Sequence, residues 1–259
     1  MSRPFDSAAG SAPRPIAYGI SSCIHVDAIA EVPFDLFGAD ACARPLRRLG
    51  DGRLRSGVVS FPPGFRGDGP KAWRSVVQMF VLGGAIEVDG MRIGQGGFVA
   101  TARGGPMPHV ASVRGAQAIV ILDHAMPAGA STGSVTVIPD VFAVEPIVPV
   151  IGGRALEGFE RRVLWEDAQT GADTRLLRVP AGFEGTGGPG FHPVEEEIFC
   201  LAGDIAPDDD TPMHAGSYLW NPRLSVHGFH EHSRGGCVLL EWHDGPWAYH
   251  RYQGPSTIT

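Results

Sequence analysis

The sequence contains no long apolar segment and no block of basic residues. No apolar run approaches the ~18 residues that a membrane-spanning helix needs, and the N-terminus has no apolar core of signal-peptide length. Charged residues make up only 19% of the chain and the formal net charge is −7, which leaves no basic surface for nucleic acid or an anionic membrane. We therefore expect a soluble, cytoplasmic protein with neither kind of partner.

Several catalytic signatures are also missing. There is no Ser-His-Asp order, no glycine-rich phosphate loop and no dinucleotide-binding fingerprint, because the glycine pairs belong to β-turns. The cysteines are far apart and form no CxxC pair. This spacing indicates buried free thiols in a reducing cytoplasm. The four positions are Cys23, Cys42, Cys200 and Cys237.

The composition favours an all-β protein. Its 36 glycines and 22 prolines in 259 residues suit a chain with many turns better than a helical one. From about residue 31, short β-prone runs alternate with turn pairs such as Asp89-Gly90 and Gly96-Gly97. The sequence predicts many short strands and few helices.

This layout occurs twice. Phe80–Gly84 resembles Phe199–Gly203, and Gly97 resembles Gly216, each pair lying 119 positions apart. So long a period indicates two similar domains rather than a solenoid of short repeats. We expect an N-terminal arm, an N-terminal barrel and a C-terminal barrel, at residues 1–30, 31–145 and 146–259 respectively.

The most informative stretch begins at His192. In a straight strand, the Cα atoms of His192 and Glu196 would lie roughly 13 Å apart at ~3.3 Å per residue. Ligands of one metal ion lie only ~3 Å from each other. The chain must therefore bend between these residues if both bind, and Pro193 favours such a bend. The run Ile198–Leu201 then forms a strand that ends at Gly203.

This stretch resembles the first motif of the cupin family, which reads loosely His-x-His, three or four residues, Glu, six residues, Gly. Glu196 and Gly203 match its last two positions, and His192 matches its second histidine. The first histidine is replaced by Gly190. A glycine there would widen the open side of the site.

A second segment resembles the second cupin motif. Gly216, Pro222 and His227 match the motif positions, whereas Leu224 replaces the usual glycine. The resemblance covers about nine-tenths of the chain and implies two tandem cupin (jelly-roll) β-barrels with few helices.

The resemblance further implies one divalent metal ion in the C-terminal barrel, bound by His192, Glu196 and His227. Two histidines and one carboxylate form the facial set of non-haem Fe(II) oxygenases, so Fe(II) is favoured. Zinc, manganese and nickel remain open. The N-terminal barrel has Trp73 and Val77 at the positions of His192 and Glu196, and is expected to bind no metal.

Further residues are expected around the metal. Glu197 or Tyr218 would transfer a proton. His243 would be either a fourth ligand or a partner that orients a ligand. An aromatic pocket with one cation would bind the substrate; its candidates are Phe199, Tyr218, Trp220, Arg223 and Trp242.

Three functions fit these expectations. The first is a metal-dependent oxygenase acting on a small aromatic, 1,2-diol or dicarbonyl compound. The second is a metal-assisted lyase, hydrolase or isomerase that does not use O₂. The third is a non-catalytic small-molecule binder, because one barrel fold supports many functions. The resemblance also implies a homodimer.

Overall fold

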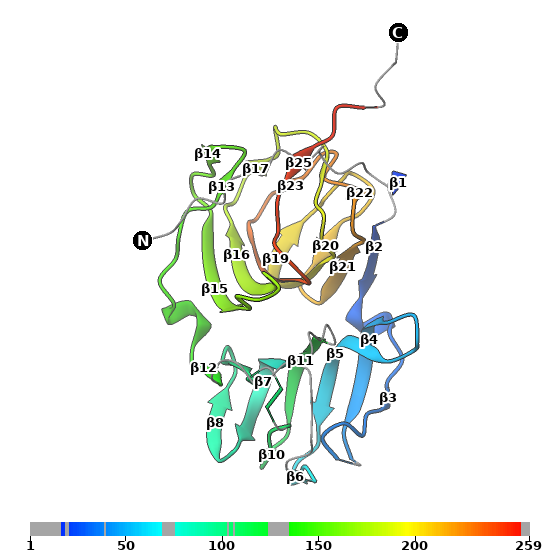
Figure 1. The fold of residues 1–259 in the computed structure, drawn as a ribbon, viewed down its shortest axis with the longest axis vertical. Coiled ribbons are helices and arrows are strands. Elements are labelled where there is room, and N and C mark those ends of the chain that lie inside the picture. Colours follow the sequence, from blue (N-terminus) through cyan, green and yellow to red (C-terminus); the bar gives the residue numbers. More distant parts are fainter. Residues whose placement is uncertain are drawn as a thin grey trace.

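The protein is almost entirely β-structure (Figure 1). The computed structural model describes residues 17–18, 21–38, 40–68, 76–102, 104–105, 107–123 and 135–254. The helices in these ranges are two single 3-10 turns, η1 (Val26–Ala28) and η2 (Val141–Ala143). No described helix is long and apolar enough to cross a bilayer. The predicted fold class, all-β with two tandem jelly-roll barrels, is confirmed.

The N-terminal barrel contains ten strands in one connected sheet. Its central path is β12 (Thr136–Ile138), β9 (Phe98–Ala100), β7 (Val76–Val88), β11 (Ala116–Asp123), β5 (Leu54–Phe61), β4 (Cys42–Arg48) and β3 (Val32–Pro33). The strands beside this path are β6 (Phe65–Arg66), β8 (Met91–Gly94) and β10 (Val110–Ser112).

The C-terminal barrel has the same order around its main sheet. The path is β15 (Glu160–Glu166), β16 (Asp173–Val179), β24 (Cys237–His243), β19 (Glu196–Ile205), β21 (Ser217–Asn221) and β2 (Ser22–His25), with β20 (Met213–His214) beside β19. Short pairs complete it: β13 (Val150–Ile151) with β14 (Arg154–Ala155), β17 (Phe183–Glu184) with β23 (His232–Ser233), β18 (Gly190–Phe191) with β25 (His250–Arg251), and β1 (Ala17–Tyr18) with β22 (Ser225–Val226).

The sequence repeat corresponds to equivalent strands. β7 and β19 occupy the same place in the two sheets, and the register of each shifts where it pairs with its neighbour β11 or β24. Gly84 and Gly203 lie two residues beyond these irregularities, with φ of 73° and 80°. A Cβ at either position would collide with the carbonyl oxygen of Gly115 or Gly236. Only glycine fits both the left-handed conformation and the close approach.

The arm predicted for residues 1–30 contributes a strand to the distant barrel. Ser22–His25 forms β2, which pairs antiparallel with β21 of the C-terminal barrel (Figure 1). This pairing satisfies backbone groups at one edge of the sheet. The domain boundaries themselves remain a prediction.

The described residues form three apolar cores. One lies inside the N-terminal barrel and one inside the C-terminal barrel, and the third combines residues of both. The shared core includes side chains at repeat-related positions, such as Phe80 with Phe199 and Ile121 with Leu240. Burial of these large apolar side chains on both sheets stabilises the contact between the barrels.

Polar groups within the contact follow the same repeat. The hydroxyl of Ser56 donates a short hydrogen bond to Oε2 of Glu197 across the barrels. At the repeat-related positions, Thr174 Oγ1 donates to Gln78 Oε1 at 2.6 Å. Glu197 also lies 3.4 Å from the guanidinium of Arg55, and both side chains are almost fully buried. Glu197 therefore balances buried positive charge at the barrel interface.

Replacement of Glu197 by alanine is expected to reduce the free energy of unfolding by about 3–5 kcal/mol, because it leaves a buried guanidinium without its counter-charge. Urea unfolding followed by circular dichroism measures this change. The matched control is Glu160→Ala, which removes a carboxylate from ion pairs with Arg162 and Arg178 on the surface. The control should lose much less stability. Equal losses in the two variants would contradict the role of Glu197.

Candidate metal centre

His192 and Glu196 meet through a bend between two strands. His192 follows β18, the chain bends at Pro193 and Val194, and Glu196 begins β19. The bend brings His192 Nε2 to 3.2 Å from Glu196 Oε2. The other ring nitrogen of His192 lies 3.0 Å from the carbonyl oxygen of Val194, which fixes the ring.

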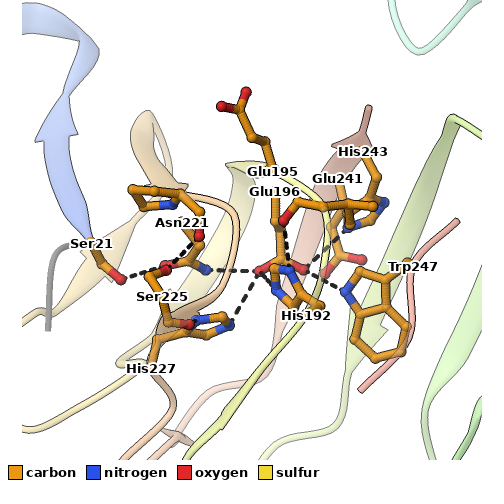
Figure 2. Close-up of polar contacts among 12 residues, drawn as sticks. Ser21, His192, Glu195, Glu196, Asn221, Ser225, His227, Glu241, His243 and Trp247 are labelled. Atoms are coloured by element: carbon orange, nitrogen blue, oxygen red, sulfur yellow. Dashed lines mark hydrogen bonds and ion pairs between the residues drawn. The ribbon is translucent and has the colours of Figure 1, made fainter. Parts of the chain in front are cut away.

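His227 approaches the same carboxylate from another strand. It follows β22, and its backbone exchanges two hydrogen bonds with Gly190, of 2.9 and 3.0 Å. Its Nε2 lies 3.6 Å from Glu196 Oε2, and its ring centroid lies 4.8 Å from that of His192. Figure 2 shows both imidazoles directed at the carboxylate.

These three side chains suit a divalent metal ion. One donor atom from each lies within 4.8 Å of the others. Nδ1 of His227 faces the carbonyl oxygen of Ser225 at 3.0 Å, as Nδ1 of His192 faces Val194. Each Nδ1 is thus placed to donate, and a neutral ring then presents the lone pair of Nε2 to the carboxylate. A cation bound between the two Nε2 atoms and the carboxylate would be coordinated by all three groups, and the carbonyls are the orienting partners that ligating histidines need.

The carboxylate of Glu196 is held by neighbours on both oxygens. Asn221 Nδ2 donates to Oε2 at 2.7 Å, and Trp247 Nε1 donates to Oε1 at 3.1 Å. Burial alone would raise the pKa of Glu196, but His192 and His243 hold that pKa well below its usual range. Burial lowers the pKa of His227, which favours its neutral form. Both protonation states are those that metal ligands require.

His243 lies on the side of Glu196 away from His227. Its Nε2 is 3.1 Å from Glu196 Oε1, and its Nδ1 is 2.6 Å from Asp173 Oδ1. Burial and Arg175 lower its pKa, but the hydrogen bonds to Asp173 and Glu196 outweigh them and raise it overall. Of the two roles expected from the sequence, this geometry favours a partner that orients Glu196.

The N-terminal arm also reaches the site. Ser21, next to β2, donates its hydroxyl hydrogen to Asn221 Oδ1, as Figure 2 shows. That bond fixes the orientation of the amide, so that Nδ2 faces Glu196. Neither residue could be recognised from the sequence, because Ser21 lies outside both motifs and Asn221 occupies a position that the second motif leaves unspecified.

The space beside Gly190 is filled. The backbone of Gly190 lies next to His227, but a Cβ on Gly190 would collide with the ring of Tyr249, whose Cζ would be 2.7 Å away. The expectation that Gly190 widens the open side is therefore wrong. An aromatic ring from the C-terminal segment occupies the place of the histidine that the cupin pattern has there.

Glu197 and Tyr218, expected to transfer protons, point away from this centre. Successive residues of a strand face opposite sides of a sheet. Glu196 pairs with Asn221 and His243 on the inner face, so Glu197 lies on the outer face toward the N-terminal barrel. There it accepts a 2.8 Å hydrogen bond from the hydroxyl of Tyr218.

The expected substrate residues are likewise outside the metal pocket. Phe199, Trp220 and Trp242 lie on the outer face with Tyr218 and pack into the core shared by the barrels. Arg223 is exposed and forms a 2.8 Å ion pair with Asp244. These four residues were grouped with the metal ligands because they are close in sequence. Strand alternation places the three aromatic side chains on the opposite face of the sheet, and Arg223 lies in an exposed turn after β21.

The pocket instead contains residues that no motif indicated. Its volume is about 170 Å³, and it opens over His192, Glu196 and His227. Apolar side chains from strands β19, β21 and β24 line it, together with charged groups. Besides the three candidate metal ligands, the charged and aromatic lining residues are Phe159, Arg161, Arg175, Phe183, Glu231, Glu241, Trp247 and Tyr249.

Part of the chain matches a known protein family. Residues 152–245 match the ChrR cupin-like domain family. These residues, which make up most of the C-terminal barrel, therefore form a cupin-like domain. No curated protein matches the sequence significantly.

Several solved structures share the fold of this chain. A candidate dioxygenase from Nostoc punctiforme is 16% identical, with a TM-score of 0.74 over 91% of this chain and 87% of that one. A variant of oxalate decarboxylase from Bacillus subtilis is 15% identical, with a TM-score of 0.57 over 91% and 82%. A pirin from Escherichia coli in complex with nickel(II) is 8% identical, with a TM-score of 0.58 over 88% and 100%. Such identities show the fold alone.

Purified protein is expected to contain about one divalent metal ion per chain, and His192→Ala or Glu196→Ala should remove it. Inductively coupled plasma mass spectrometry after extensive dialysis measures the content. The matched control is His230→Ala, in the exposed cluster of Asp209, His230 and His232. If the control loses the metal and His192→Ala keeps it, the metal is bound at the surface instead.

Glu231→Gln is expected to change how the stability of the metal-free protein depends on pH. Burial, with the charges of Glu196 and Glu241, raises the pKa of Glu231 from 4.5 to about 7. The folded state thus favours the protonated carboxyl. Relative to the variant, the wild type should lose stability as pH rises from about 4.5 to about 7. Urea unfolding across this range tests the effect, with the exposed Glu166→Gln as control. Parallel curves for wild type and Glu231→Gln would contradict it.

Proposed function

We propose that this protein is a metal-dependent enzyme, with Fe(II) as the favoured metal and an oxygenase reaction on a small aromatic, diol or dicarbonyl compound as the favoured activity. The observation that carries the proposal is the convergence of His192 and His227 on one oxygen of Glu196 at the wall of a pocket. Two imidazoles and one carboxylate leave coordination positions for substrate and O₂. When bound, Fe(II) would polarise the substrate and supply electrons to O₂.

The protein's own residues would position the ligands and limit access. His243, Trp247 and Asn221 fix the carboxylate of Glu196, so its orientation does not depend on solvent. Tyr249 covers Gly190 and leaves the pocket as the open approach. Apolar side chains such as Ile198, Leu219 and Leu239 exclude water from the inner wall.

The size of the pocket limits the substrate. A volume of about 170 Å³ holds on the order of a dozen water molecules, and therefore a molecule with a similar number of non-hydrogen atoms. Such a space suits a single-ring aromatic or a short dicarbonyl compound. The structural similarity to a candidate dioxygenase also supports this proposal.

Oxygen uptake tests the proposal. Protein loaded with Fe(II) under anaerobic conditions is mixed with catechol, a vicinal diol or acetylacetone, and O₂ consumption is followed after air is admitted. We expect uptake that depends on one of these compounds and falls about 100-fold or more in His227→Ala. Tyr218→Phe should retain the uptake, because Tyr218 faces the other barrel. No substrate-dependent uptake across the panel would contradict the oxygenase activity.

One observation favours a second candidate, a metal-assisted lyase or isomerase without O₂. Glu231 lines the pocket, and among the described residues its side chain forms no hydrogen bond or ion pair. A carboxyl with a pKa of about 7 can both donate and accept a proton near neutral pH. Turnover by the zinc-loaded protein in the absence of O₂, lost in Glu231→Gln, would identify this class.

A further inference from the structure

The metal pocket contains two guanidinium groups with different surroundings. Arg175 lies in the pocket wall and is neutralised: its Nε donates to Glu241 Oε2 at 2.9 Å, and its NH1 lies 3.5 Å from Asp173 Oδ2. Its guanidinium also stacks over the ring of Trp247, at 5.0 Å from the centroid. The role of Arg175 is fully explained by these contacts.

Arg161 has no such partners. It lies on β15 next to β16, and its backbone is held by two hydrogen bonds of 2.8 Å to Ile147. Its side chain lines the pocket, but no described carboxylate forms an ion pair with it, and its Nε is buried without a hydrogen-bond partner. A buried donor without a partner costs about 1–3 kcal/mol, and more when it carries charge.

The charged groups that act on Arg161 do not form an ion pair with it. Burial and the charge of Arg175 lower the pKa of Arg161, and the charges of Glu241 and Asp173 only partly oppose them. Glu241 is already paired with Arg175, and Glu196 faces the metal ligands. A divalent ion bound by His192, Glu196 and His227 would add positive charge to the same pocket.

The surroundings of Arg161 also indicate what kind of anion fits. Leu156, Phe159 and Leu177 line the same part of the pocket, and Leu177 is paired directly with Arg161 across the strands. Apolar neighbours suit an anion with an organic body better than a strongly hydrated inorganic ion. A planar guanidinium binds a carboxylate through two parallel hydrogen bonds.

We propose that the pocket binds a small organic carboxylate, with its carboxylate group on Arg161 and its other end at the metal ligands. Only the contact between the ligand's other end and the metal rests on the proposed function; the contact with Arg161 does not. It narrows the substrate to compounds that carry an acid group, such as an aromatic acid or a keto acid.

Calorimetric binding of carboxylates to the metal-free and the zinc-loaded protein tests the assignment. The probes are salicylate, benzoate and malonate, with salicylamide as the neutral counterpart of salicylate and inorganic phosphate as the inorganic anion. We expect at least one carboxylate to bind, salicylamide and phosphate to bind much more weakly, and Arg161→Gln to weaken carboxylate binding about 10–100-fold. Arg161→Lys should restore part of this loss.

The control is Arg178→Gln on the neighbouring strand, whose side chain is 62% exposed and pairs with Glu160. It should bind the carboxylates as the wild type does, and circular dichroism confirms that both variants are folded. Three results would overturn the assignment. Carboxylate binding could be unchanged in Arg161→Gln, phosphate could bind as tightly as the carboxylates, or no carboxylate could bind at 10 mM, a concentration that corresponds to a binding free energy of about 3 kcal/mol. Because the metal-free protein already reports on Arg161, failure to load metal would contradict the proposed function without affecting this test.

Discussion

The polar interior of the C-terminal barrel depends on the carboxylate of Glu196. Its side chain is 8% exposed, and an unpaired charge in such a position would be very costly. Asn221, His243 and Trp247 donate to its two oxygens, and the imidazoles of the metal site face it from two further segments. Segments far apart in the sequence are therefore oriented around one anion, and the remaining negative charge is directed at the space where a cation would bind.

Because side chains alternate along a strand, Glu196 and Glu197 face opposite sides of the sheet and have different roles. Glu196 faces the barrel interior, whereas Glu197 faces Arg55 and Ser56 of the other barrel. The repeat shows that the interior charge is specific to one barrel, because Val77 takes the place of Glu196 in the N-terminal barrel and is fully buried in its apolar core. One face of this sheet thus forms the polar centre, and its opposite face forms the contact with the other barrel.

Much of this arrangement could be predicted from the sequence. The 119-residue repeat and the turn glycines indicated two β-barrels, and motif spacing with the bend at Pro193 indicated which side chains meet. The aromatic pocket was misplaced, since Tyr218 and Trp242 are close to the ligands in sequence but on the opposite face. Trp247 and Arg161 could not be found, because their positions follow from how the C-terminal segment and strand β15 close the barrel.

Crystallography of the protein with its native metal, using anomalous scattering recorded at the metal's absorption edge, tests the central claim most directly. We expect one strong anomalous peak about 2.0–2.2 Å from Nε2 of His192, Nε2 of His227 and an oxygen of Glu196. A peak only at the exposed cluster of Asp209, His230 and His232, or no peak between the three buried side chains, would contradict the account.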